Sequence, residues 1–227
     1  MSQATTTGHQ AIPAPRGVRN SATRIVASTV GVLAGLLGIE HGYFETLQGN
    51  VTPGSIMINA KGPPCLPPPL GCEPAMTIIP NFFVTGVLTI IVGLIVVIWA
   101  AAFVQRKHGG LVLILLSIIQ LLVGGGLAPI SLGIIAGAAG TRINAPLTWW
   151  RAHLTVHSRR FLTTLWPWSL IAFFILDLGI FILGYFFGAT WFNLNLTTNL
   201  GYFQVGLMLL TVLAGFAYDI QRQTNLH

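Results

Sequence analysis

The stretch GLVLILLSIIQLLVGGGLAPISLGIIAGAA, residues 110–139, decides how this chain folds. It is apolar for 30 residues but is interrupted by Gly124, Gly125 and Gly126, and Pro129 follows shortly after. A glycine triplet followed by a proline is a point where a helix can break. Glycine destabilises a helix because it loses much conformational entropy there, and proline lacks the backbone N–H that a helix needs. The segment can therefore cross a membrane as one kinked span, or it can enter the membrane and turn back.

The composition indicates that the chain folds in a membrane. It has 227 residues, of which 53% are hydrophobic and 7% are charged, and its mean hydropathy is +0.76. Soluble domains contain about 25% charged residues. The net charge of +6 does not indicate nucleic acid as a partner, because the basic residues cluster between apolar runs and no nucleic-acid-binding motif is present.

The sequence predicts one multi-pass transmembrane domain over residues 25–220. A basic tail, expected to be disordered, precedes it at 1–24, and a short polar tail follows at 221–227. A Pro-rich loop at 49–75 and an amphipathic interfacial helix at 144–160 connect its apolar segments. These apolar segments are residues 25–48, 76–104, 110–139 (broken), 161–187 and 200–218.

The eleven Lys and Arg side chains indicate whether the broken segment crosses the membrane. If all five segments cross, five of these side chains lie on the side of the N-terminal tail and six lie opposite. If residues 110–139 turn back, the division becomes ten and one. Positive side chains gather on the cytoplasmic side of membrane proteins, so the charges favour a segment that turns back.

We therefore predict an all-α fold: a polytopic integral membrane helical bundle with four full spans and one broken, re-entrant segment. Five full spans are the alternative. The same charge rule predicts that both termini are cytoplasmic and that the loop at 49–75 is exoplasmic, in the plasma (inner) membrane.

Polar residues form a stripe near the end of the first span. His41, Glu45 and Gln48 fall within an arc of about 60° on a helix, whereas Glu40 falls on the opposite side. A histidine with a carboxylate one turn away is typical of a proton or metal site, and Glu73 can join His41 and Glu45 as a metal ligand. The alternative is an interfacial polar network that only satisfies the helix end and the loop.

Glycines form a second stripe on the same span. Small residues at this spacing let another helix approach closely, so this face is expected to point into the bundle. The glycines are Gly31, Gly35, Gly38 and Gly42.

Asp177 is a carboxylate trapped inside an apolar span. It lies nine residues after Trp168, about 14 Å along a helix from an expected interface anchor. Gln120 reaches a similar depth and is the predicted hydrogen-bond partner. Asp177 can serve as a proton-relay or substrate-coupling group, or it can form a neutral structural hydrogen bond between helices.

Both cysteines, Cys65 and Cys72, lie in the Pro-rich loop. An exoplasmic position permits a disulfide between them, and six intervening residues are enough to close a small loop. Two free thiols are the alternative.

Residues 144–160 combine Trp149 and Trp150 with three basic residues, a pattern that favours binding to anionic lipids. The basic residues are Arg151, Arg159 and Arg160. His153 and His157 have a spacing that can chelate zinc, but the Glu of the protease pattern His-Glu-x-x-His is missing.

Three classes of function fit these features. We favour an accessory or assembly subunit that binds a membrane protein partner or a second copy of itself, because no motif assigns a catalytic residue or a cofactor. The first alternative is a small proton- or cation-coupled transporter or channel that uses Asp177 and the crevice at His41 and Glu45. The second is a metal- or quinone-dependent redox protein, although the spans lack the paired histidines that a haem would need.

Overall fold

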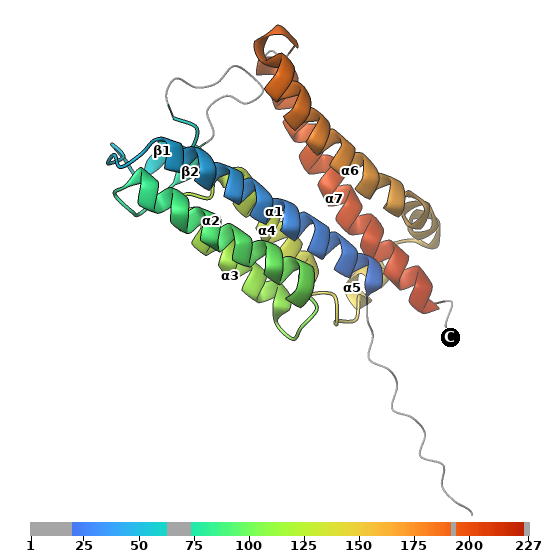
Figure 1. Ribbon diagram of the computed structural model, residues 1–227. Coiled ribbons are helices and arrows are strands. Elements are labelled where there is room, and N and C mark those ends of the chain that lie inside the picture. Colours follow the sequence, from blue (N-terminus) through green and yellow to red (C-terminus); the bar gives the residue numbers. More distant parts are fainter. Residues whose placement is uncertain (1–19, 63–73, 192–193, 225–227) are drawn as a thin grey trace, which may run out of the picture.

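The computed structural model describes residues 20–62, 74–191 and 194–224 (Figure 1). Most of the basic tail predicted at 1–24 lies outside these ranges, as do Cys65, Cys72 and Glu73. The disulfide and the role of Glu73 as a metal ligand therefore remain predictions. Residues 21–24, which we assigned to the tail, belong to the first helix.

The described chain folds into seven α-helices and one small antiparallel sheet. The strands β1 and β2 pair in the connection between the first two helices. The helices are α1 (Ser21–Leu47), α2 (Phe82–Ile98, prolonged by the π-helical turn Trp99–Phe103), α3 (Gly109–Leu122), α4 (Leu127–Gly140), α5 (Thr148–His153), α6 (Val156–Trp191) and α7 (Leu194–Thr224), and the strands are β1 (Met57–Asn59) and β2 (Pro74–Met76).

Four helical stretches in the described chain are long and apolar enough to cross a membrane. They are Ser21–Leu47, Phe82–Phe103, Val156–Ile180 and Asn199–Thr224. The predicted fold class, an all-α polytopic membrane bundle with four full spans, is confirmed.

The broken segment turns back. Its two helices, α3 and α4, have 14 residues each, about 21 Å at the usual helical rise. The two helices run antiparallel, because the start of α3 contacts the end of α4. Gly110 lies against Gly137 and Gly140, and a Cβ built at Gly133 would overlap the hydroxyl of Ser117. The re-entrant hairpin predicted from the charges is therefore correct, and the alternative of a fifth full span is wrong.

Both described ends of the chain lie at the same end of the bundle (Figure 1). At this end, which we call the terminal end, the first turn of α1 meets the last turns of α7. The opposite end, with β1, β2 and the tip of the α3–α4 hairpin, is the loop end. The α6–α7 hairpin meets the α1–α4 bundle near the terminal end and diverges from it toward its own tip (Figure 1).

Glycines on both helices let α1 and α2 pack backbone against backbone. A Cβ built at Gly42 would lie 2.7 Å from the carbonyl oxygen of Gly86, and one at Gly35 would lie 2.8 Å from that of Gly93. A Cβ at Gly31 would lie 2.8 Å from the side chain of Ala100. Such close contacts supply dispersion energy in a membrane, where no hydrophobic effect drives helices together.

The second span begins later than predicted. Helix α2 starts at Phe82 rather than at Met76, and β2 occupies part of the predicted span. Pro80 disfavours helical backbone at the residue before it, and the Asn81 side chain then caps the helix by accepting a hydrogen bond from the N–H of Val84 at 3.0 Å.

The amphipathic helix predicted at 144–160 is divided in two. It forms the short helix α5 and the first turn of α6, and the chain is extended at Leu154 between them. The hydroxyl of Thr155 accepts a hydrogen bond from the N–H of Ser158 at 3.2 Å, so Thr155 caps the start of α6 and separates it from α5.

Asp219, near the end of α7, caps the N-terminus of α1. Its Oδ1 accepts a hydrogen bond from the N–H of Ala22 at 3.0 Å. Its Oδ2 accepts from the N–H and the hydroxyl of Thr23, at 2.8 Å and 2.7 Å. The first N–H groups of a helix have no partner within the helix and carry partial positive charge, so a buried carboxylate there ties α7 to α1.

Asn20 ties the α4–α5 connection to the same point. Its N–H donates to the carbonyl of Ile143 at 2.8 Å, and its side-chain amide donates to the carbonyls of Arg142 and Ala145 at 2.6 Å and 3.0 Å. Its Oδ1 accepts a hydrogen bond from Gln223 of α7 at 2.6 Å. The terminal end is thus held by hydrogen bonds between segments far apart in the sequence.

We expect Asp219→Ala to lower the free energy of unfolding by about 2 kcal/mol, because the N–H groups of Ala22 and Thr23 lose a buried acceptor. Reversible unfolding in mixed micelles measures this change. Gln221→Ala, on the same turn of α7, serves as the control and should shift it by less than about 0.5 kcal/mol. Equal effects of the two substitutions would contradict the capping role.

Candidate functional site

The tip of the α3–α4 hairpin is a turn built from glycines. Gly124 and Gly126 have φ angles of +116° and +79°, a backbone conformation that residues with a side chain rarely adopt. The N–H of Gly125 donates to the carbonyl of Gln120 at 2.7 Å and ends α3. Helix α4 then begins at Leu127, with no side chain capping its first turn.

The connection between α1 and α2 closes over this tip. Thr77 forms an isolated antiparallel bridge with Val123, and the N–H of Ile78 donates to the carbonyl of Leu122 at 3.0 Å. From α2, the hydroxyl of Thr89 donates to the carbonyl of Val123 at 2.5 Å. The irregular backbone at the tip is therefore covered by protein, and only backbone covered in this way is tolerated in the hydrocarbon core of a membrane.

Each glycine of the tip lies against a buried polar side chain. A Cβ at Gly124 would overlap the carboxylate of Glu45, and one at Gly126 would overlap the imidazole of His41. A Cβ at Gly125 would overlap the side chain of Gln120. We call Glu45, His41 and Gln120 the polar column.

The polar column follows successive turns of α1. Glu45 and His41 lie one turn apart on α1, and the amide of Gln120 packs against Gly38, a further turn toward the terminal end. Glu45 and Gln120 are fully buried, and His41 is 4% exposed. The carboxylate, imidazole and amide are thus arranged along the interface between α1 and the hairpin.

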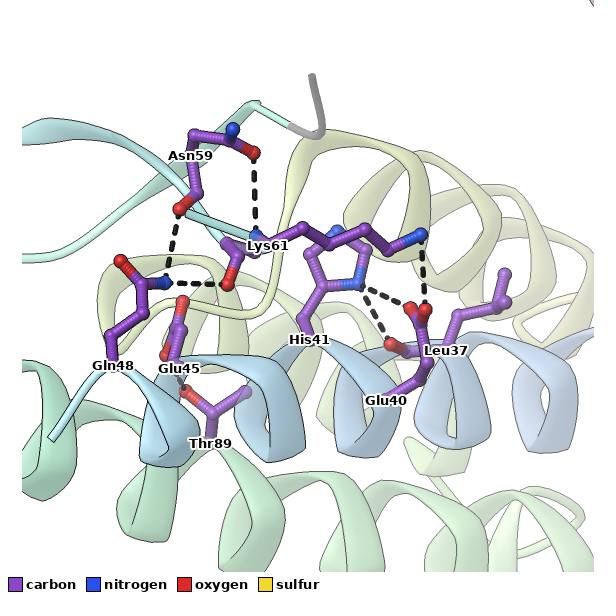
Figure 2. A network of polar contacts seen from close by, with 9 residues as sticks. Leu37, Glu40, His41, Glu45, Gln48, Asn59, Lys61 and Thr89 are labelled. Carbon is purple, nitrogen blue, oxygen red and sulfur yellow. Dashed lines mark hydrogen bonds and ion pairs between the residues drawn. The ribbon is translucent and has the colours of Figure 1, made fainter. Parts of the chain in front are cut away.

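The carboxylate of Glu45 is buried but has few hydrogen-bond partners (Figure 2). Its Oε2 lies 3.5 Å from the hydroxyl of Thr89, but that hydroxyl is much closer to the carbonyl of Val123. Among the described residues, Oε1 has no hydrogen-bond partner. A buried polar atom without a partner costs about 1–3 kcal/mol, more if it is charged, so Oε1 is available to a proton or a cation.

Gln120 is also a buried side chain whose polar atoms, the amide nitrogen and the amide oxygen, have no hydrogen-bond partner within the described chain. The amide is held in place by packing against Gly38 and Gly125. Its oxygen is a neutral ligand that a cation can use, and its nitrogen can donate to an anionic or neutral group.

Glu40 and Lys61 connect the column to the loop (Figure 2). The Nζ of Lys61 lies 3.1 Å from Oε1 of Glu40, and Nδ1 of His41 lies 3.3 Å from Oε2 of Glu40. We expected Glu40 on the opposite side of α1, against aromatic residues or headgroups. It lies beside its sequence neighbour His41 instead, because the loop brings Lys61 back over the helix.

The carbonyl of Leu37 fixes the orientation of the His41 ring. Nδ1 lies 2.9 Å from this oxygen, which can only accept a hydrogen bond, so Nδ1 carries a proton. Nε2 is the ring nitrogen that faces Gly126 at the hairpin tip. The imidazole therefore presents one nitrogen to Glu40 and the helix backbone, and the other to the turn.

An open pocket of about 450 Å³ borders His41, between α1, β2 and the start of α4. His41 and Glu40 line one wall, and the first turns of α4 with Leu127 and Ser131 line another. Gln48 does not reach this pocket. Its amide donates to the carbonyls of Asn59 and Ala60 at 3.2 Å and 2.7 Å, so it anchors the loop.

Asp177 bonds to Gln204 rather than to the predicted partner, Gln120. The side-chain amide of Gln204, on α7, donates to Oδ1 of Asp177. Gln120 packs against α1 instead. The sequence analysis missed Gln204, although an amide at the fifth position of the last apolar segment was a signal for it.

In the described part of the chain, no three His, Cys, Asp or Glu side chains gather closely enough to hold a metal ion. His153 stacks on Trp149, with ring centroids 4.2 Å apart, and its Nδ1 bonds to the Trp149 carbonyl at 2.8 Å. His41 and Glu45 contact the tip at different glycines. The metal interpretation therefore has no support from the described residues.

Comparison with known proteins gives no family for this chain: no family model, curated protein or solved structure matches it. Its function has to be argued from the site itself.

We expect Gly126→Ala to destabilise the protein by about 2 kcal/mol more than Gly49→Ala. Both glycines have nearly the same positive φ, +79° and +78°, but a Cβ at Gly49 would meet no atom within 4 Å. The two substitutions share the backbone strain, so the difference measures the overlap with His41. Equal losses in unfolding experiments would show that the tip does not pack on the imidazole.

Proposed function

We propose that the protein carries protons or a small monovalent cation across the membrane and binds them at Glu45. The observation that carries this proposal is a fully buried carboxylate with a partnerless oxygen, placed against a break between two helices. Ionisable groups inside membrane proteins are costly, and they typically mark ion or proton pathways. Broken helices at membrane depth commonly form the binding sites of transporters.

The polar column supplies a route from the pocket to Glu45. His41 lines the pocket and also contacts the hairpin tip, so its ring can pass a proton between the two. Glu45 is one helical turn away, about 6 Å along the axis. Gln120 extends the column by a further turn and offers an amide oxygen to a cation.

An apolar layer favours a carrier over an open channel. Beyond Gln120 toward the terminal end, α1, α3 and α4 contribute Ala34, Leu113 and Ala136, each at most 1% exposed. Water and ions do not cross such packed apolar side chains. Release toward the terminal end therefore requires the hairpin and α1 to rearrange, as in alternating access.

The charge count supports an orientation for this transport. Of the nine Lys and Arg side chains in the described chain, all but Lys61 lie toward the terminal end, and the preference of positive side chains for the cytoplasm therefore favours a cytoplasmic terminal end. The pocket at His41 then opens to the exoplasmic side, and Glu45 is loaded from there.

A second candidate is the accessory or assembly subunit favoured by the sequence. One observation supports it: only 11% of the residues in the apolar window of the span Val156–Ile180 are buried within this chain. A transmembrane helix of a partner, or of a second copy, can pack against α6 where the α6–α7 hairpin diverges from the bundle (Figure 1). This role leaves the partnerless Glu45 unexplained, so we place it second.

We expect Glu45→Gln to lower the flux of the transported ion by about 100-fold in proteoliposomes, because the amide can neither take up a proton nor carry charge. Internal pH and cation-sensitive dyes would follow H⁺, Na⁺ and K⁺ separately. Asp177→Asn, the equivalent change at the other carboxylate within a span, is measured beside it, and Gln221→Ala, outside both sites, is the control that should retain this ion flux within about twofold.

Three results would count against the proposal. Wild-type protein that moves none of the three ions would contradict transport. Glu45→Gln with wild-type flux would contradict the role of Glu45. Flux that is lost in Asp177→Asn and kept in Glu45→Gln would move the ion site to the other carboxylate.

A further inference from the structure

A second pocket, of about 430 Å³, is lined by residues of four helices. Leu37 of α1 and Leu132 of α4 form one side, and Phe173 and Asp177 of α6 with Gln204 of α7 form the other. Pockets of this size bind small organic molecules. Asp177 and Gln204 are its hydrogen-bonding pair, and most of the remaining lining is aliphatic or aromatic.

The charge of Asp177 is not compensated by the described chain. Its carboxylate accepts a hydrogen bond from the Gln204 amide, a neutral donor. The ion pairs among the described residues involve Glu40, with Lys61 and His41, and none involves Asp177. A carboxylate that stays ionised inside a membrane needs a positive partner, and the pocket is where that partner can bind.

The walls of the pocket favour an apolar ligand. Ile180, Val205 and Met208 line it together with Phe173 and Leu132. An inorganic cation would leave these surfaces without a role and would find only one carboxylate and one amide as ligands. An anionic amphiphile would be repelled by Asp177. An organic cation with an aliphatic chain matches both the charge and the walls.

This pocket adjoins the pocket at His41. Leu37, Ala128 and Ser131 line both, so the two form one groove along α1 and α4. The groove leads from His41 on α1 to Asp177 on α6. A ligand can therefore reach Asp177 without crossing the packed interior.

We propose that this groove binds an amphiphilic organic cation, with a protonated amine or quaternary ammonium group at Asp177 and Gln204 and an aliphatic chain along the apolar wall. This inference deepens the proposed function and rests on it in one respect: it makes the organic cation the cargo, and the ion at Glu45 the coupling ion. Binding itself does not depend on transport.

Equilibrium binding of radiolabelled decyltrimethylammonium to the full-length chain in zwitterionic nanodiscs tests this proposal, with empty nanodiscs to subtract partition into lipid. Decanol and decyl sulfate, which have similar chains without the positive charge, are the competitors. We expect saturable binding that neither competitor displaces. We expect Asp177→Asn to weaken it by about 30-fold, the lower range for loss of a buried charge partner.

Gln204→Lys provides a second test that does not remove the carboxylate. The lysine ammonium would occupy the position of the ligand's head group beside Asp177, so binding should be abolished while the helices stay paired. Gln204→Met, which loses only a neutral hydrogen bond, is the matched comparison and should weaken binding by about fivefold, far less than the lysine does. Ser131→Leu, at an exposed position of the shared wall, should weaken binding by narrowing the groove.

The outcomes separate this proposal from the proposed function. Unchanged binding in both Asp177→Asn and Gln204→Lys, or equal binding of decanol, would overturn the cation site whatever the ion flux. Glu45→Gln should bind decyltrimethylammonium as the wild type does, because Glu45 lies outside the groove. Specific binding by a protein that moves no ion would support this site and refute the transport role.

Discussion

The contact between the glycines of the hairpin tip and the polar side chains of α1 is the constraint on which the rest of the structure depends. Backbone at Gly124 and Gly126 lies against Glu45 and His41 only because no side chain intervenes and positive φ angles are allowed there. That contact turns the chain, so α4 returns beside α3 and α6 then starts from the terminal end. It also covers irregular backbone with protein at membrane depth.

Two polar regions separated by an apolar layer follow from this arrangement. At the loop end the polar column is reached through a pocket, whereas at the terminal end Asn20 and Asp219 use their hydrogen bonds to hold α1, α7 and the α4–α5 connection together. The terminal end is therefore held together by hydrogen bonds, whereas the loop end contains a pocket. Because α6 and α7 are tied at the terminal end and diverge elsewhere, a groove forms beside the polar column, and Asp177 faces it. The coupling ion and the organic cation that we propose would thus occupy neighbouring sites.

The features that the sequence predicts correctly depend on residues within one segment or on the distribution of charge along the chain. The glycine triplet and the positions of eleven basic side chains are enough to predict the re-entrant hairpin. Pairings between distant segments could not be predicted in this way. The bond of Gln204 to Asp177 depends on the register of α6 against α7, the cap that Asp219 provides depends on where α7 ends, and the ion pair of Lys61 with Glu40 depends on how a loop folds back. No periodicity within one segment contains that information.

The side of the membrane on which each connection lies tests the central claim most directly. Single cysteines introduced as Gly54→Cys, Lys107→Cys and Arg151→Cys, all at exposed positions, would be labelled in intact vesicles with an impermeant thiol reagent after Cys65 and Cys72 are replaced by Ser. A hairpin that turns back predicts that positions 107 and 151 react from the same side and position 54 from the other. Reaction of position 151 together with position 54 would contradict the re-entrant hairpin and the site built on its tip.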